Sequence, residues 1–466
     1  MTTRRSEPPA PPAPPATPTV HPVIRWAFYV FILSLPFEYP NRSIPWETTT
    51  ITCALFLFAA LFQPRVCLRR FPGAVAWFVA FLYVFLVSFV VNGGQYEDEV
   101  QKFFLLLLQV VLLFWVASNV LRDEKVFRLT PVLLAVTCTA RAVLQLLNIG
   151  TRHSAEWVGG ERVSMLGQNA NHSSMMMAAG LVALIALGYT GSAPWRRRRL
   201  LIWPVAALIG LAIIQNGSRG GLLALAMGVM TFALSGAGVQ ARIRSASIVL
   251  LALVLLIWAS YNSEGMRNRF EETATTGYMA GRERIYPELV RMFAERPILG
   301  FAPIANKYVL GGRLPMQHYP RRDAHNLLLE VMTATGIVGL IPFLLGQWLV
   351  WRAAWRARRG PAGILPLALL VTVMVANMSG NWLAAPLLWF VMAYALLSDR
   401  VPTPAPARAP VRRRPAPAPA PASRPASRPE AAPVGTRSGG GPVALLPGGA
   451  EPPKAPQGDD EGAGPC

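Results

Sequence analysis

The chain has 466 residues, of which 53% are hydrophobic and only 15% are charged. A soluble domain usually carries about 25% charged residues, so most of these side chains do not face water. The net charge of +20 lies in short clusters between apolar runs and in the C-terminal part of the chain. This distribution fits a membrane topology better than a nucleic-acid-binding surface, which needs a continuous basic face on a folded domain.

Apolar segments fill the middle of the chain, between two Pro/Ala-rich ends. Residues 1–22 and 401–466 have too little apolar surface to offset the entropy of ordering, so both are expected to be disordered tails. Residues 23–400 predict an all-α integral membrane domain of about 12 transmembrane helices, since a lone strand cannot satisfy its backbone in lipid. The apolar runs are 23–37, 48–62, 73–91, 103–121, 126–148, 173–190, 200–215, 220–236, 246–261, 325–351, 363–379 and 382–398.

Positive charge alternates between the loops that join these runs. The basic loops contain Arg65, Arg69 and Arg70; Arg122, Lys125 and Arg128; Arg196 to Arg199; Arg242 and Arg244; and Arg352, Arg356, Arg358 and Arg359. Because Lys and Arg accumulate in cytoplasmic loops, the pattern predicts that both termini are cytoplasmic. It also places one large loop, residues 262–324, on the periplasmic side, where its amphipathic stretch 283–295 predicts a helical cap.

Polar residues gather where the chain enters or leaves the membrane on that periplasmic side. The candidate site residues are Arg219 in a Gly-Ser-Arg-Gly-Gly turn, Arg282 and Arg284 in the large loop, His325 and Asn326 at the next re-entry, and Arg162 with Asn169, Asn171 and His172. Each also has a structural interpretation, as an interface anchor, a solvated helix face or a helix-starting hydrogen bond.

Together these residues predict a specific chemistry. Guanidinium groups are permanently charged, planar donors that match phosphate oxygens, and a neutral imidazole can accept a proton from an attacking hydroxyl. Transfer of a sugar from a lipid diphosphate needs both functions. No cofactor and no metal site is expected, although Glu97, Asp98 and Glu99 form the nearest acidic cluster.

Short motifs in this order make the chain resemble the O-antigen ligase family, within the superfamily of bacterial O-antigen ligases and polymerases. Residues 219–223 match an Arg-x-x-x-Leu motif, and His325 with Gly336 matches a His followed by ten residues and Gly. Residues 282–286 and 297–300 resemble an Arg-x-x-Ile-Trp and a Pro-x-x-Gly pattern, with Tyr286 in place of Trp. The resemblance covers roughly residues 23–400.

This resemblance implies a membrane glycosyltransferase of the GT-C type in the bacterial inner membrane, with its site on the periplasmic face. The implied reaction is a metal-independent, inverting transfer of O-antigen from undecaprenyl diphosphate to a sugar hydroxyl of lipid A–core. The partners would be that lipid-linked donor, the lipid A–core acceptor and membrane lipids, with no nucleic acid. An O-antigen polymerase and a protein O-oligosaccharyltransferase remain alternatives within the superfamily. A lipid-linked sugar transporter is an alternative of another class, for which Arg141 within the fifth run is the main support.

Overall fold

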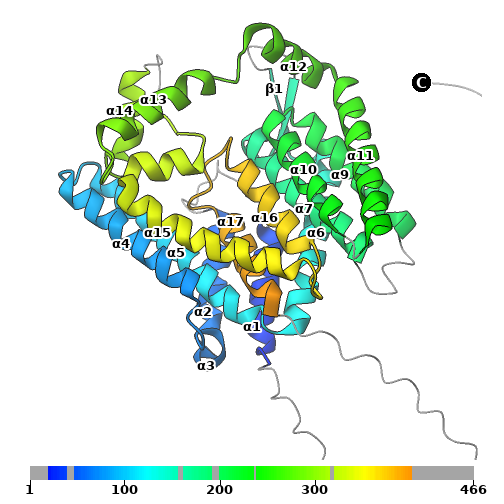
Figure 1. The fold of residues 1–466 in the computed structure, drawn as a ribbon, viewed down its shortest axis with the longest axis horizontal. Coiled ribbons are helices and arrows are strands. Elements are labelled where there is room, and N and C mark those ends of the chain that lie inside the picture. The colour runs from blue at the N-terminus through cyan, green and yellow to red at the C-terminus, as the bar shows by residue number, and fades with distance from the viewer. Residues whose placement is uncertain are drawn as a thin grey trace, which may run out of the picture. The chain divides into compact units, whose positions relative to one another are not determined.

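A computed structural model describes residues 19–38, 47–155, 161–190, 199–235, 238–314 and 320–400. Apolar helices make up most of it (Figure 1). They are α1 (Pro22–Ser34), α2 (Thr48–Ala60), α4 (Gly73–Val91), α5 (Glu97–Val120), α6 (Glu124–Leu146), α7 (Ala170–Thr190), α9 (Arg199–Gln215), α10 (Arg219–Met230), α11 (Val239–Tyr261), α15 (Leu327–Ala357), α16 (Leu365–Ala376) and α17 (Pro386–Leu397). Each predicted apolar run coincides with one of these helices.

Six of these helices are long and apolar enough to cross a membrane, by length and composition, within the described residues. They are α4, α5, α6, α7, α11 and α15. The other apolar helices are shorter; α10, for example, continues into the 3-10 helix η1 (Thr231–Leu234). The structure is therefore an all-α membrane protein as predicted, whereas the number of helices that cross the bilayer remains a prediction.

Smaller elements lie between the apolar helices. Near one end, α3 (Pro64–Cys67) follows α2, and η2 (Ser398–Arg400) follows α17. The strands β1 (Thr151–Ala155) and β2 (Glu161–Met165) pair antiparallel, with Thr151 opposite Met165. The sequence did not predict this hairpin. Apolar residues alternate only in the short strand β2, where Val163 and Met165 are buried on one face, and so short a pattern is a weak strand signal.

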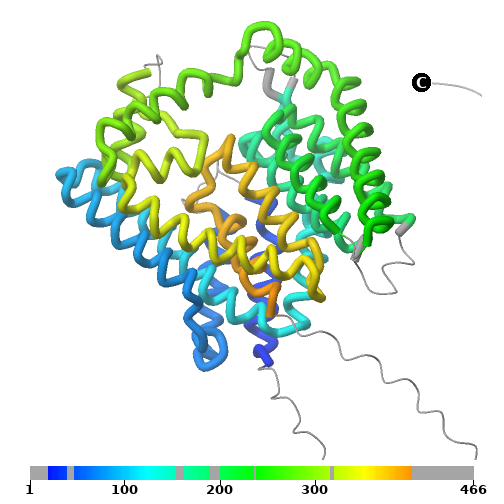
Figure 2. The backbone as a smooth tube through the Cα atoms, viewed as in Figure 1, coloured from blue at the N-terminus to red at the C-terminus, as the bar shows by residue number. Residues whose placement is uncertain are grey.

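The large loop 262–324 folds into α12 (Glu264–Thr276), α13 (Arg282–Glu295) and α14 (Ala305–Arg313). The path from α12 to α13 can be followed in Figure 2. The predicted amphipathic helix is α13, which buries Ile285, Leu289 and Met292 along one face. Removing such side chains from water contributes roughly 1.5–3 kcal/mol each.

This loop docks onto α15 through a break in that helix. Gly336 has a φ of 61° and a ψ of −163°, which interrupts α15 nine residues after its start. Backbone N–H groups freed by the break donate to the segment 297–300: Ile337 N to the Pro297 carbonyl at 2.7 Å and Val338 N to the Ile298 carbonyl at 3.3 Å. In return, Phe301 N donates to the Thr333 carbonyl at 2.8 Å.

Two glycines permit this approach. A Cβ at Gly336 would overlap the Ile298 carbonyl oxygen, and one at Gly300 would lie 2.5 Å from the Thr333 oxygen. The Ser88 hydroxyl, from α4, completes the junction, 2.6 Å from the Leu299 carbonyl. The glycines of two sequence motifs therefore serve to join the loop to the helix that follows His325.

Four of the five arginine-rich loops lie next to one another in pairs, whereas residues 191–198 of the fifth fall outside the described residues. Arg69, Arg70 and Arg400 are all close enough to Arg122 to interact with it electrostatically, and Arg242 and Arg359 are similarly close to Arg358. This pairing agrees with the predicted alternation of the loops, although the side of the membrane stays a prediction.

The predicted tails fall almost wholly outside the described residues. Residues 1–18 and 401–466 are among those not described, so their disorder stays a prediction. Residues 19–22, which were assigned to the N-terminal tail, are described: Val20 is buried and its N–H donates to Asp123 Oδ2 at 3.2 Å. Residues 19–22 therefore pack against the membrane domain.

Candidate functional site

A short turn between α16 and α17, residues 377–381, forms the centre of the candidate site. Its carbonyl oxygens accept hydrogen bonds from two other segments, the start of α15 and helix α13. Leu327 N donates to the Asn377 oxygen at 2.9 Å, at the point where α15 begins. The Asn377 side chain holds the turn from within, accepting from Trp382 N at 2.9 Å.

Helix α13 reaches this turn with two residues of one sequence motif. Arg282 Nη2 donates to the Ser379 carbonyl at 2.9 Å, and its Nη1 donates to the Met279 carbonyl at 3.3 Å. The Tyr286 hydroxyl lies 2.7 Å from the Met378 carbonyl and 3.0 Å from that of His325. The Nε of Arg282 is buried without a hydrogen-bond partner in the described structure. Arg282 is thus anchored by two backbone oxygens, and its Nε–H donor is left unused by the described residues.

Helix α10 approaches the same turn through its glycines. A Cβ at Gly220 would overlap Ser379 Oγ, and one at Gly221 would overlap Ser174 Oγ on α7, so a larger residue at either position would have to displace a serine side chain. The Ser218 side chain caps the helix by accepting from Gly221 N at 3.1 Å. This packing brings Arg219, the first residue of α10, beside the turn that Arg282 contacts.

The guanidinium of Arg219 is also held by backbone oxygens. Its Nη1 donates to the Arg269 carbonyl at 3.0 Å and the Tyr278 carbonyl at 3.2 Å, and it contacts the Thr273 hydroxyl. Nε and Nη2 donate to no atom of the described chain. Arg219 interacts electrostatically with Arg282, so two cationic groups with free N–H donors lie near each other.

His325 lies immediately before α15, beside this pair. Its backbone has a φ of 49°, in the left-handed region that non-glycine residues rarely adopt. Its ring keeps solvent access at the surface, yet protein surrounds it on most sides. Desolvation lowers the pKa of His325 below its ordinary value, and the positive charge of Arg282 lowers the pKa further. A larger fraction of the imidazole is therefore neutral near pH 7, which is the form that accepts a proton.

Asn326 has a structural role at the same place. Its side-chain oxygen accepts from Leu328 N at 3.0 Å and Leu329 N at 3.2 Å and so caps α15. Its amide nitrogen is 3.4 Å from the Met378 carbonyl. Asn326 thus ties the start of α15 to the central turn.

The other predicted residues lie further from this centre. Arg162 is buried on β2, where it donates to the Asn216 carbonyl at 3.0 Å and to Asn171 Oδ1 at 2.7 Å. It therefore fastens the hairpin to the segment that precedes Arg219. Arg284 is exposed on the side of α13 away from Arg282, and no hydrogen bond joins its side chain to the described chain.

The acidic cluster at the start of α5 is engaged with protein groups. Glu99 accepts from the Tyr308 hydroxyl and from Arg321 Nη1, both at 2.6 Å. Among the residues that the structure describes, no group of three or more His, Cys, Asp or Glu side chains is placed to hold a metal ion.

Several residues of the site were not singled out from the sequence. The turn 377–381 was noted only as a short loop, and Arg269 was not noted at all, although Arg269 Nη1 donates to the Gly217 carbonyl at 3.2 Å beside Arg219. A run of small and amide residues between two apolar segments was the available signal for the turn. The turn matters because of hydrogen-bond partners some 50 to 100 positions away along the chain; Arg282, for example, is 97 positions from Ser379.

The fold and this site define a class of protein. It is an all-α membrane protein with two anchored arginines and a histidine gathered at one end of its apolar helices. That combination suits the binding and reaction of an anionic, membrane-associated substrate.

Comparison with known proteins shows which family the chain is similar to. The family model described as O-antigen ligase matches residues 204–344, which include Arg219, Arg282 and His325. An O-antigen ligase of Pseudomonas aeruginosa is 27% identical over 360 residues, covering 73% of this chain and 82% of that protein. Both matches support the O-antigen ligase family, as the sequence motifs indicated, and thereby a glycosyltransferase type of enzyme.

Proposed function

We propose that this protein transfers O-antigen polysaccharide from undecaprenyl diphosphate to a sugar hydroxyl of lipid A–core, on the periplasmic face of the inner membrane. The observation that carries the proposal is the position of Arg282. It interacts electrostatically with both Arg219 and His325, so diphosphate-binding groups and a proton acceptor are close together. The two family matches point to the same type of reaction.

The proposed step breaks one bond to the anomeric carbon and forms another. The acceptor oxygen attacks that carbon, and His325 takes the hydroxyl proton. The bond from the carbon to the phosphate oxygen breaks, and undecaprenyl diphosphate leaves with the bonding electrons. Arg219 and Arg282 stabilise its negative charge through their free N–H groups. Attack opposite the leaving group inverts the configuration, and no metal takes part.

The transporter alternative receives little support from Arg141. This buried residue donates to the Pro36 carbonyl at 2.6 Å and to Ser173 Oγ at 2.5 Å, so its charge is stabilised within the protein. A polymerase or a protein O-oligosaccharyltransferase would use the same donor groups, and only the acceptor distinguishes them.

A reconstituted assay separates these possibilities. Purified protein in vesicles receives lipid-linked glycan together with lipid A–core, a second lipid-linked glycan or an acceptor protein, in separate reactions. The proposal expects a product with lipid A–core, and His325→Ala in the same vesicles shows whether that product depends on the site. A product with either other acceptor alone would reassign the function. Movement of label across the vesicle without a new glycosidic bond would indicate a transporter.

A further inference from the structure

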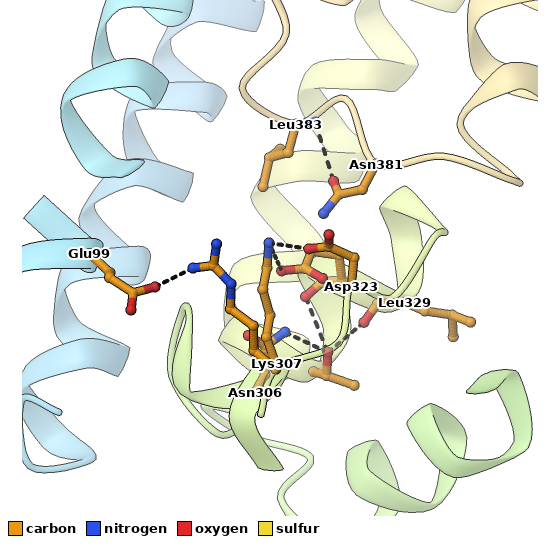
Figure 3. A network of polar contacts seen from close by, with 10 residues as sticks. Glu99, Asn306, Lys307, Asp323, Leu329, Asn381 and Leu383 are labelled. Carbon is orange, nitrogen blue, oxygen red and sulfur yellow. Dashed lines mark hydrogen bonds and ion pairs between the residues drawn. The ribbon is translucent and has the colours of Figure 1, made fainter. Parts of the chain in front are cut away.

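A second cluster of charged side chains lies where α14 meets α15 (Figure 3). Lys307 Nζ is 2.6 Å from Asp323 Oδ1 and 3.9 Å from Glu330 Oε1. The Glu330 side chain is only 3% exposed and that of Lys307 13%. The Lys307 ammonium also lies 5.6 Å from the centre of the Phe103 ring.

The charges in this cluster depend on one another. A buried charge is costly unless a partner of opposite sign stabilises it. Burial opposes the charge on Lys307, but Glu330 and Asp323 together outweigh it, so the pKa of Lys307 is raised. Desolvation would raise the pKa of Asp323, but the charge and hydrogen bond of Lys307 outweigh it, so that pKa is lowered. Lys307 and Asp323 are therefore both charged near neutral pH.

This ion pair acts on the segment that carries the histidine. Asp323 precedes His325 by two residues, and Arg322 N also donates to the Lys307 carbonyl, at 3.0 Å. Ala324, between them, is buried in the apolar cluster of Ile285, Leu289, Met292, Phe301 and Leu310. Asn326 holds the other side of His325 through the Met378 carbonyl.

These contacts account for the unusual backbone of His325. A left-handed conformation at a residue other than glycine costs of order 1–3 kcal/mol and persists only where its surroundings impose it. Here residues 322–324 are fixed by α14, and residue 326 is fixed by the central turn. Within α14, Asn306 adds a bond of 3.1 Å to Thr333 on α15, so the helix that carries Lys307 is itself anchored.

We propose that Lys307 is a positioning residue for the reaction, holding residues 322–326 so that the His325 ring stays at the arginine site. This inference rests on the proposed function, in which His325 accepts the hydroxyl proton. Lys307 touches no reacting atom. It acts on the segment of His325 through its ion pair with Asp323 and through the hydrogen bond from Arg322 N to its carbonyl oxygen.

The electrostatic surroundings of His325 provide a readout that general stability would not affect. Positive charge faces the ring from Arg282 on α13, from Lys307 on α14 and from Arg322 on its own segment, and Asp323 supplies the opposing negative charge. Removal of the Lys307 charge should therefore raise the pKa of His325. Removal of the Asp323 charge should lower it.

The test measures transfer from lipid-linked glycan as a function of pH in Lys307→Met and Lys307→Arg. Displacing a catalytic group by about 1 Å can slow a reaction about 10²-fold, so Lys307→Met should slow transfer by up to that factor with little change in the KM for donor. The acidic limb of the pH profile of Lys307→Met should move to higher pH. Lys307→Arg should recover most of the wild-type rate and the wild-type position of the limb. Arg313→Met is the matched control, because Arg313 is also an ion-paired cation of α14 but contacts Glu288 and Glu295 instead.

A wild-type rate and pH profile in Lys307→Met would overturn the inference. It would also be overturned if Arg313→Met slowed transfer as much as Lys307→Met and the acidic limb of Lys307→Met stayed at the wild-type pH. If Lys307→Met does not fold, Asp323→Asn replaces it, since that side chain is 55% exposed. Its limb should move to lower pH, and a limb at the wild-type position would overturn the inference. If His325→Ala loses transfer while Lys307→Met keeps a normal rate and pH profile, only the positioning role is refuted. Normal transfer in His325→Ala would instead refute the proposed base.

Discussion

Replacement of His325 tests the proposed chemistry most directly. Within the described chain no hydrogen bond is made to its imidazole, and Tyr286 contacts only its carbonyl oxygen, which every substitution retains. His325→Ala and His325→Gln should therefore fold and bind donor normally. Because a positioned base typically contributes about 10²–10⁴-fold, transfer should fall by that factor, or roughly 3–5 kcal/mol at about 1.36 kcal/mol per decade.

The pH dependence of the wild-type protein follows from the surroundings of the same ring. Desolvation and Arg282 lower the pKa of His325, so the free enzyme should keep its neutral imidazole to below the ordinary pKa of about 6.5. The kcat/KM for donor, which reports the free enzyme, should therefore decline only below that pH. A bound diphosphate adds negative charge beside the ring and raises its pKa. The acidic limb of kcat should consequently lie at higher pH than that of kcat/KM.

The assay combines donor binding with single-turnover transfer across pH, at matched protein levels. His153→Ala serves as control, because His153 is another exposed histidine and belongs to the β-hairpin rather than to the segment before α15. Near-normal transfer by both His325 variants would refute a catalytic role for this residue. A wild-type rate that rises on acidification would keep the site but reject the base, since imidazolium would then be the active form.

Three further expectations follow from the geometry. Arg219→Lys should lose nearly as much transfer as Arg219→Ala. An ammonium has only three donors, and the Nη1 of Arg219 already contacts three protein oxygens, so no donor would remain for the diphosphate. Full activity in Arg219→Lys, with Arg291→Lys as control, would exclude the diphosphate role. Transfer should survive EDTA, and a loss that magnesium or manganese restores would contradict the metal-free reaction. Gly336→Ala should release the large loop from α15, which would be measured as faster proteolysis of residues 262–324 and a lower Tm. The reasons are that a Cβ overlaps the Ile298 carbonyl and that the positive φ alone costs a non-glycine residue about 1–3 kcal/mol. Gly312→Ala, where a Cβ meets no atom within 4 Å, should leave both measurements unchanged.

Hydropathy and charge along the chain determine the broad architecture. The apolar runs matched helices to within a few residues at most ends, and the amphipathic stretch 283–295 proved to be α13. These features are local: an apolar run of sufficient length must form a helix to satisfy its backbone in lipid, wherever it lies in the chain. The same local information was enough to single out Arg219 and His325, which stand where polar sequence meets an apolar run, whereas Arg282 lies within the large loop and was singled out by its motif.

Only the tertiary structure decided how those residues meet. Arg282 and Arg284 are two positions apart in the same charged stretch, yet one contacts Ser379 and the other is exposed, because the helix turns their side chains to different faces. The close packing of Gly220 against Ser379 and the break at Gly336 depend on partners far away in the chain. Hydropathy and spacing report the environment of single segments, whereas the site consists of contacts between segments. The sequence by itself therefore determined which residues were available for chemistry, and long-range packing decided which of them share a site.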